Sequence, residues 1–289
     1  MPHTHLISAA ELQTLVRSGA PLMVFDCSFD LADPQKGIAD YHAAHLPGAL
    51  YAHLDHDLSA AGGPAVSGGR HPLPTRERFS AWLASVGFSN GMQAVVYDRN
   101  GSMPGMRLWW LLKWLGHDAA AVLDGGLAAW QASGGTSARN EEAPRAPGHF
   151  KPGKPLRTLV DATQVLARLG RADQTLLDAR AAERWRGDIE PLDPVAGHIP
   201  GALNRPWMDN LTADGHFKSA AALRTEFATI LRQRDPATVV HQCGSGVSAI
   251  HNLLAMELAG YPQGALYAGS WSEWCSDPAR PVAHLREAA

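Results

Sequence analysis

The chain contains an internal repeat, and this repeat limits the folds that it can adopt more than any other feature of the sequence. Landmark residues recur in the same order, most of them at an offset of 144 residues and those upstream at 152 or 153. The matched pairs are 95–98 with 239–242, Gly116 with Gly260, Gly125 with Gly269, Trp130 with Trp274, Asp26 with Asp178, and His-x-Pro-Gly-Ala at 45–49 with 198–202. A repeat of this length exceeds a solenoid unit and matches a small domain. The sequence therefore predicts two related domains in tandem.

The two copies differ in length at one place. The interval from His45 to Val95 is 50 residues, whereas the matching interval from His198 to Val239 is 41. The first copy therefore carries a longer excursion, and its glycine-rich stretch 61–69 is the expected extra loop.

A stretch between the copies has the character of a linker. Residues 138–155 are rich in Pro, Gly and charge and lack apolar periodicity, as linkers commonly do. We expect one domain at 1–137, the linker at 138–155, and a second domain at 156–289.

Composition excludes several classes of protein. Apolar residues make up 45% and charged residues 18% of the chain, so a core can form, and the net charge of -3 offers no basic surface for nucleic acid. The N-terminus lacks a signal-peptide pattern, and the most apolar run, 108–115, contains Lys113 and is too short to span a bilayer. Three scattered cysteines form no disulfide framework, and no cluster of His, Cys and carboxylates has metal-ligand spacing. We expect a cytoplasmic protein with no metal, no cofactor, no nucleic acid and no membrane partner.

Short apolar runs alternate with helical stretches in each copy. In the second copy, Ile250, Leu253, Leu254 and Leu258 form one apolar face of a helix. Strand, helix and strand in this order imply an α/β fold with a parallel sheet flanked by helices. Ligands bind such sheets at the loops beyond the carboxyl ends of the strands. The expected strands are 22–27, 94–97 and 120–123 in the first copy and 175–179, 238–241 and 265–267 in the second.

One loop at a strand end carries reactive chemistry. The expected strand 238–241 runs into Gln242-Cys243-Gly244-Ser245-Gly246-Val247-Ser248-Ala249, and a helix follows. Two glycines let successive backbone N–H groups turn inward, and the helix N-terminus adds further donors. Such a cradle favours a thiolate or a sulfur adduct on Cys243 over a neutral thiol.

The alternative interpretation of Cys243 is a buried small hydrophobic residue, the commoner role of a cysteine. Cys27 and Cys275 lack a comparable loop and are interpreted as structural. At the 144-residue offset, Cys243 corresponds to Arg99, so only the second copy can perform thiol chemistry.

The tandem repeat, the two His-x-Pro-Gly-Ala motifs, the Cys-Gly-Ser-Gly-Val-Ser-Ala loop and Gly-Ser-Trp-Ser-Glu-Trp at 269–274 resemble the two-domain rhodanese-type sulfurtransferases. The resemblance implies two rhodanese-like α/β domains with the active cleft between them, the first domain being non-catalytic. It implies that Cys243 takes up sulfur as a persulfide. The sulfur then passes to a thiol, to cyanide, or to a thioredoxin-like reductant.

The resemblance also assigns roles to individual residues. The loop is similar to that of the 3-mercaptopyruvate enzymes, so Gly244, Gly246, Val247 and Ser248 are expected to contact the substrate. Arg184 matches the arginine that grips the substrate carboxylate, and its alternative interpretation is a surface arginine. Asp55 and His71 match residues proposed to form an array with Ser245, although Asp55 also suits a solvated loop.

Two departures bear on the sulfur donor. Thiosulfate-preferring relatives typically carry Arg-Lys where this chain has Gly244-Ser245, so a monoanionic donor such as 3-mercaptopyruvate is expected over dianionic thiosulfate. A second substrate arginine is usual near 190–194, where this chain has Asp193 instead. Arg186 is a candidate to compensate for it.

Two other functions compete with sulfur transfer. A cysteine-dependent phosphatase uses a similar strand–loop–helix cradle, but it needs an arginine six residues after the cysteine, and residue 249 is Ala. A catalytically inactive binding protein is the second alternative, and the intact Cys243 loop argues against it.

Overall fold

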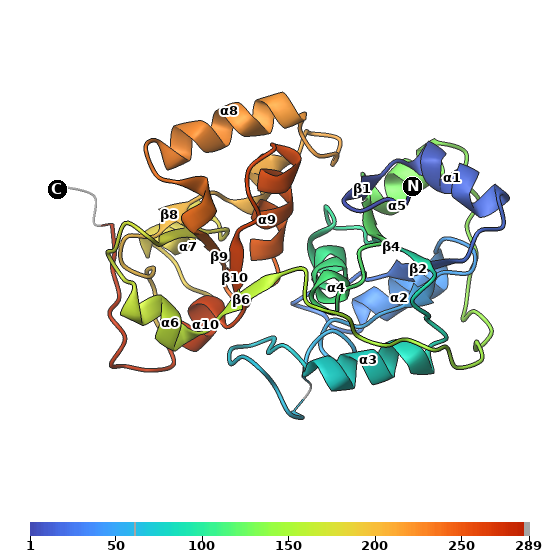
Figure 1. The fold of residues 1–289 in the computed structure, drawn as a ribbon, viewed down its shortest axis with the longest axis horizontal. Coiled ribbons are helices and arrows are strands. Elements are labelled where there is room, and N and C mark those ends of the chain that lie inside the picture. Colours follow the sequence, from blue (N-terminus) through green and yellow to red (C-terminus); the bar gives the residue numbers. More distant parts are fainter. Residues whose placement is uncertain (61, 286–289) are drawn as a thin grey trace. The chain divides into compact units, whose positions relative to one another are not determined.

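The computed structural model describes residues 1–60 and 62–285 of the chain. It divides into two compact units, each built around its own sheet (Figure 1). The first unit comprises residues 1–64, 74–157 and 213–216, and the second comprises 65–73, 158–212 and 217–289. Within the described residues, no helix is both long and apolar enough to cross a membrane.

The first unit contains a parallel sheet of five strands in the order β1-β5-β4-β2-β3. Its central strands are continuous buried runs, as expected for a sheet that is covered on both faces. The strands are β1 (Leu6–Ile7), β2 (Leu22–Asp26), β3 (Leu50–Tyr51), β4 (Gln93–Tyr97) and β5 (Ala120–Leu123).

Helices connect these strands and supply the rest of the core. In α1, a capping box at Ser8 satisfies the free N–H groups of the first turn, and Leu12 packs inward with Leu123 and Trp130. The helices are α1 (Ala9–Arg17), α2 (Lys36–Ala43), α3 (Arg76–Ser85), α4 (Met103–Trp114) and α5 (Gly126–Ala132).

The second unit repeats the architecture of the first. Its five parallel strands have the order β6-β10-β9-β7-β8, which is the same order, position by position, as in the first unit. The strands are β6 (Thr158–Val160), β7 (Thr175–Asp178), β8 (Leu203–Asn204), β9 (Val239–Gln242) and β10 (Ala265–Tyr267). The predicted fold class, tandem α/β domains with parallel sheets, is confirmed.

The helices of the second unit include the predicted one after the cysteine loop. Helix α9 buries Ile250, Leu253 and Leu254 of the predicted apolar face, whereas Leu258, at the end of the helix, is half-buried. The helices are α6 (Ala162–Ala167), α7 (Ala182–Arg186), α8 (Ala220–Leu231), α9 (Ala249–Leu258) and α10 (Ser270–Trp274), with short 3₁₀ turns at Trp207–Asn210 and Pro236–Thr238.

The boundaries of the six expected strands lie within one residue of the observed ones, whereas the short edge strands β1, β3, β6 and β8 were not expected. The expected strand 238–241 is instead Val239–Gln242, because Thr238 ends the preceding 3₁₀ turn, where its hydroxyl donates to the carbonyl of Asp235. The one-residue shift extends the strand to Gln242, so the loop begins directly at Cys243.

Two expected loops have a more definite structure than the sequence indicates. Residues 65–73, within the extra excursion of the first copy, belong to the second unit. Residues 138–155 lie along the first unit, where Ala138, Gly148 and Gly153 donate backbone N–H groups to His45, Ala84 and Leu115. Where independently folding domains begin and end stays a prediction.

Candidate active site

The Cys243 loop lies at the carboxyl end of β9, beside the end of β7. Asp178 pairs with Gln242 in the register of these two strands, so the loops that follow both strands emerge at one edge of the sheet. Cys243 is 1% exposed. The backbone N–H of Gly246 donates to its Sγ at 3.2 Å, which is the inward-turned donor that the loop sequence predicts.

Gly246 is the residue that makes this turn possible. Its φ is 74°, and a Cβ at this position would lie 2.1 Å from the carbonyl oxygen of Ala268. No other residue fits there without moving the backbone, since both the conformation and the close approach require glycine. The loop therefore closes back on Cys243 because position 246 carries no side chain.

Helix α10 holds the loop from the other side. The N–H of Cys243 donates to the Ser270 hydroxyl at 3.0 Å, and the N–H groups of Trp271 and Ser272 donate to the carbonyls of Cys243 and Gly244, each at 2.9 Å. Ser270 adopts a φ of 55°, an uncommon conformation for a residue with a side chain. The Gly-Ser-Trp-Ser-Glu-Trp motif thus fixes the backbone on which the thiol sits.

Two members of the predicted array are in contact. The Nδ1 atom of His71 lies 2.7 Å from the hydroxyl oxygen of Ser245, and both side chains are buried. His71 belongs to the 65–73 segment of the second unit, whereas Asp55 belongs to the first unit, where its N–H donates to His53. The participation of Asp55 in the array stays a prediction.

Arg184 of α7 lies beside the loop and is bound to two carboxylates. Its Nη2 atom is 2.6 Å from Glu190 and 3.1 Å from Asp193, and its side chain is 15% exposed. A Cβ at Gly244 would lie 3.6 Å from its Nη1 atom. Its position suits contact with a substrate at the loop and does not fit a free surface arginine.

Sequence reasoning missed two arginines in this region. Arg70 pairs with Asp193 at 2.7 Å, and its Nη2 atom would lie 3.3 Å from a Cβ at Gly244. Arg184 is therefore not alone beside the loop, because Arg70 reaches it from the 65–73 segment. The extra length of the first copy was the one signal that could have drawn attention to this segment.

The second missed arginine is Arg180, which is fully enclosed. It pairs with Asp178 at 2.7 Å and with Glu190 at 3.4 Å, and it stacks 4.8 Å from the ring centre of Trp271. Burial of the Arg180 guanidinium opposes its charge, yet the carboxylates of Asp178 and Glu190 outweigh burial and raise its pKa. Arg180 thus links β7, the 190–193 stretch and α10 through two ion pairs and a cation–π contact.

The remaining residues predicted to bind the substrate are Val247 and Ser248 in the loop and Arg186 in α7. Val247 is buried, and its carbonyl accepts the N–H of Ile250 at the start of α9. Ser248 precedes that helix in an αR conformation. Arg186 pairs with Asp188 at 2.7 Å, and both side chains are exposed; its expected role in compensating for Asp193 stays a prediction.

Other sequence motifs have structural roles in the fold. The His45 and His198 side chains contact the backbone carbonyls of Tyr41 and Trp185 at 2.8 and 2.7 Å, so both histidines bond to nearby backbone. Burial raises the pKa of both the Cys27 thiol and the Cys275 thiol, as suits unreactive cysteines. Among residues 1–60 and 62–285, no group of His, Cys, Asp and Glu is arranged to hold a metal ion.

The corresponding loop of the first unit is built differently. The buried Asp98 carboxylate accepts the N–H groups of Asn100, Ser102 and Gly105 at 2.7 to 2.9 Å. Burial raises the pKa of Asp98 to about 6, against the opposing effect of these bonds. Arg99, at the position of the cysteine, pairs with Asp26 at 2.9 Å. In the first unit, the Asp98 carboxylate thus accepts the backbone N–H groups of the loop, and Arg99 stands at the position of the cysteine.

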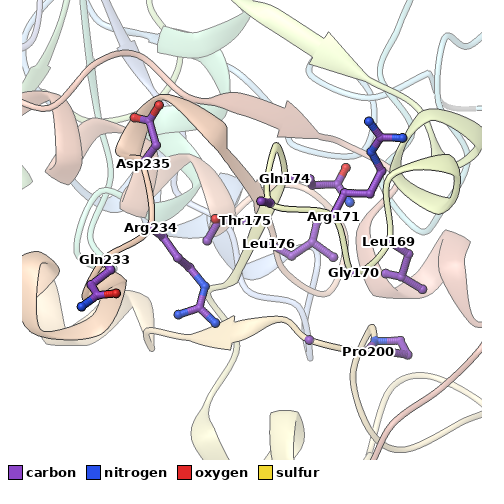
Figure 2. A pocket seen from close by; sticks show the side chains of 12 residues that line it. Leu169, Gly170, Arg171, Gln174, Thr175, Leu176, Pro200, Gln233, Arg234 and Asp235 are labelled. Carbon is purple, nitrogen blue, oxygen red and sulfur yellow. The ribbon is translucent and has the colours of Figure 1, made fainter.

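A cavity in the second unit lies away from this chemistry. It has a volume of about 580 Å³ and adjoins the amino end of β7, and its lining includes Gln174, Thr175, Arg234 and Asp235 (Figure 2). Cys243 follows the carboxyl end of the parallel strand β9. The candidate active site is therefore the Cys243 loop, chosen for its chemistry, and not this cavity.

Comparison with known proteins agrees with the tandem architecture. The sequence model of the rhodanese-like domain family matches this chain twice, at residues 8–133 and 161–277. A probable 3-mercaptopyruvate sulfurtransferase of Pseudomonas aeruginosa is 46% identical over 284 residues, covering 98% of this chain and 99% of that protein. A putative thiosulfate sulfurtransferase of Mycobacterium tuberculosis is 38% identical over 278 residues, covering 96% of each.

A solved structure supports the same assignment. The 3-mercaptopyruvate sulfurtransferase from Leishmania major superimposes with a TM-score of 0.82 at 28% identity, covering 96% of this chain and 75% of that one. Sequence and fold agree over nearly the whole chain. The protein belongs to the rhodanese-like family and is a sulfurtransferase with two rhodanese domains in tandem.

Proposed function

We propose that the protein transfers sulfur from 3-mercaptopyruvate through a Cys243 persulfide to a thiol or to cyanide. The observation that carries this proposal is the Cys243 loop, in which a backbone N–H points at the thiol and two guanidinium groups lie beside Gly244. The first feature suits a negative sulfur, and the second suits the carboxylate of a small donor.

The first half-reaction forms one bond and breaks one bond. The Cys243 thiolate attacks the sulfur of 3-mercaptopyruvate, an S–S bond forms, and the C–S bond breaks. The electron pair of the C–S bond remains on carbon as the enolate of pyruvate, which becomes pyruvate when it takes up one proton. The protein is left with a persulfide on Cys243, and no external oxidant or reductant is needed.

The contact between Ser245 and His71 supports this chemistry. The enolate needs a proton, and a serine hydroxyl hydrogen-bonded to a histidine at 2.7 Å is a suitable donor within the loop. Because both side chains are buried, their hydrogen bond is shielded from competing water. We assign Ser245 the transfer of this proton, with His71 as its partner.

The second half-reaction returns the enzyme to its starting state. Cyanide attacks the outer sulfur of the persulfide, the S–S bond breaks, and thiocyanate leaves with Cys243 again a thiolate. A thiol attacks in the same way and becomes a persulfide itself. A dithiol such as a thioredoxin-like reductant then closes to a disulfide and releases hydrogen sulfide.

Thiosulfate is the alternative donor, and one observation favours it. Arg70 and Arg184 both lie near Gly244, which gives the loop more cationic neighbours than its own sequence supplies. Glu190 and Asp193 pair with these arginines, however, and offset much of their charge. A dianion loses more from this neutralisation than a monoanion does, so we retain 3-mercaptopyruvate as the preferred donor.

A steady-state comparison of the two donors tests the proposal. Pyruvate release from 3-mercaptopyruvate and sulfite release from thiosulfate are measured, with a dithiol and with cyanide as acceptors. We expect kcat/KM to be at least about ten-fold higher for 3-mercaptopyruvate, since one charge-assisted hydrogen bond contributes roughly 1.5–3 kcal/mol. Equal or higher efficiency with thiosulfate would overturn the donor assignment and leave the sulfurtransferase chemistry intact.

A further inference from the structure

We propose that Arg70 is a specificity-determining residue that, together with Arg184, binds the carboxylate of the sulfur donor. This inference rests on the proposed function, because it requires a donor that carries a carboxylate. Arg70 lies far from Cys243 in the sequence, yet it belongs to the same unit of the structure as the Cys243 loop.

The backbone around Arg70 is tied to the helix that also holds the cysteine loop. The N–H of Arg70 donates to the Ser272 hydroxyl at 3.0 Å, and the N–H of Gly68 donates to Glu273 at 3.0 Å. The N–H of Ser272 in turn donates to the carbonyl of Gly244 at 2.9 Å. Two hydrogen bonds in series therefore fix Arg70 with respect to the loop, which is the rigidity that substrate orientation requires.

The guanidinium groups of Arg70 and Arg184 converge on one point of the loop. A Cβ at Gly244 would lie 3.3 Å from Nη2 of Arg70 and 3.6 Å from Nη1 of Arg184. Gly244 directly follows Cys243, so this point lies in the same loop as the reacting sulfur. Because position 244 carries no side chain, the space in front of both guanidinium groups is left for another group.

Asp193 determines how the two arginines are oriented. One of its oxygens accepts from Nη1 of Arg70 at 2.7 Å, and the other accepts from Nη2 of Arg184 at 3.1 Å. Its side chain is 3% exposed. The buried Asp193 carboxylate thus binds one nitrogen atom of each guanidinium group. The other terminal nitrogen atoms, Nη2 of Arg70 and Nη1 of Arg184, lie near Gly244.

Arg70 also has an N–H donor that no residue described by the structure satisfies. Among the residues that the structure describes, the buried Nε atom of Arg70 has no hydrogen-bond partner. A buried donor without a partner is costly unless a ligand satisfies it. A carboxylate that gives one oxygen to each guanidinium group, as Asp193 does on the opposite side, fits the two inward-facing nitrogen atoms.

Charge limits the ligand to a single negative charge. Asp193 and Glu190 contribute two negative charges next to the two arginines. A small 2-oxo acid with one carboxylate gains directed hydrogen bonds here without needing an excess of positive charge. Asp193 is therefore a positioning residue for Arg70 and Arg184, rather than a residue that merely repels the donor.

The test compares two donors that differ only in the carboxylate. 3-Mercaptopyruvate and mercaptopropanone share a thiol-bearing carbon beside a ketone, but mercaptopropanone has a methyl group where the first has a carboxylate. For Arg70→Gln we expect kcat/KM with 3-mercaptopyruvate to fall about 10- to 100-fold, mainly through KM. We expect its kcat/KM with mercaptopropanone to change less than about two-fold. Arg70→Lys should recover part of the loss, since it retains charge without the planar fork.

A matched control separates this effect from the loss of an ion pair in general. Arg171 also pairs with an aspartate, Asp173, but it lies at the amino end of β7, so Arg171→Gln should leave both donors unaffected. An equal loss with both donors in Arg70→Gln would show a purely structural role and overturn the inference. Unchanged kinetics with 3-mercaptopyruvate would overturn it as well, while the proposed function stands. If the wild type itself fails with 3-mercaptopyruvate, the proposed function and this inference fail together.

Discussion

At the level of single residues, some members of the candidate site can be recognised from the sequence alone, and others only from their contacts in the structure. Cys243, Ser245 and Gly246 could be singled out because a thiol, a hydroxyl and glycines stand together after a strand. Arg70 could not be, because its hydrogen bond to Asp193 spans 123 positions of the chain. The local sequence therefore identifies the Cys243 loop, whereas ion pairs between residues distant in the chain determine which charged side chains lie around this loop.

Replacing Gly246 by alanine tests the geometry of the loop. The positive φ costs a side chain roughly 1–2 kcal/mol, and the carbonyl of Ala268 at 2.1 Å adds a clash. We expect Gly246→Ala to lower Tm and to reduce kcat/KM by more than ten-fold. Gly201→Ala is the control, because Gly201 has a φ of 78° with open space around it. If both variants retain full activity, the loop does not depend on this close approach.

Ser245→Ala tests the proton transfer. Losing a general acid lowers kcat by about 10²- to 10⁴-fold where a proton must be delivered. Sulfite leaves thiosulfate as a stable anion and needs no proton, whereas the enolate of pyruvate does. We therefore expect kcat with 3-mercaptopyruvate to fall much more than kcat with thiosulfate. Equal losses for the two donors would assign Ser245 a structural role.

At the level of elements, the three central strands of each sheet and the helix after the cysteine were predictable, because buried runs of β-forming residues and a 3.6-residue periodicity are local signals. The edge strands β1, β3, β6 and β8 were not, because two or three residues are too few to show a pattern. The 65–73 segment was not predictable. It contains Gly, Ser, Pro and Arg without periodicity, and its position comes from bonds to Ser272 and Glu273 of α10. The segment supplies both His71 and Arg70, so the part of the site that the sequence predicted least well is this one loop.

Ser272→Ala tests the attachment of the 65–73 segment. The variant removes the hydroxyl that accepts the N–H of Arg70 and keeps the backbone bond to Gly244. One hydrogen bond contributes about 0.5–1.5 kcal/mol, so we expect KM for 3-mercaptopyruvate to rise about three- to ten-fold. Ser276→Ala, which removes an exposed hydroxyl bonded to the Glu273 carbonyl, should leave KM unchanged. A Ser272→Ala enzyme with wild-type KM would contradict this account of Arg70.

At the level of the whole molecule, the repeat predicted two related domains, each with its own parallel sheet, and the structure shows that the two sheets share one strand order. The rhodanese resemblance is confirmed by two family matches that cover both copies. The repeat could not predict that residues 65–73 belong to the second unit, since they lie between β3 and β4 of the first sheet in the chain. The copies share a fold, but only the second has a thiol in its loop.

Limited proteolysis tests the predicted boundary between the domains. Most residues in 138–155 are exposed and lie outside helices and strands, so a protease should cut there first. We expect two primary fragments of comparable size, identified by mass spectrometry of the early products. Primary cleavage inside one of the two sheets would contradict the boundary.

The most direct test of the account is whether Cys243 carries the transferred sulfur. Intact-protein mass spectrometry after incubation with 3-mercaptopyruvate, followed by removal of excess donor, measures the adduct. We expect the wild type to gain the mass of one sulfur atom, to lose it on addition of cyanide or a dithiol, and Cys243→Ser to gain none. A sulfur adduct of the same yield in Cys243→Ser, or a wild type that turns over donor without forming this adduct, would contradict the central claim.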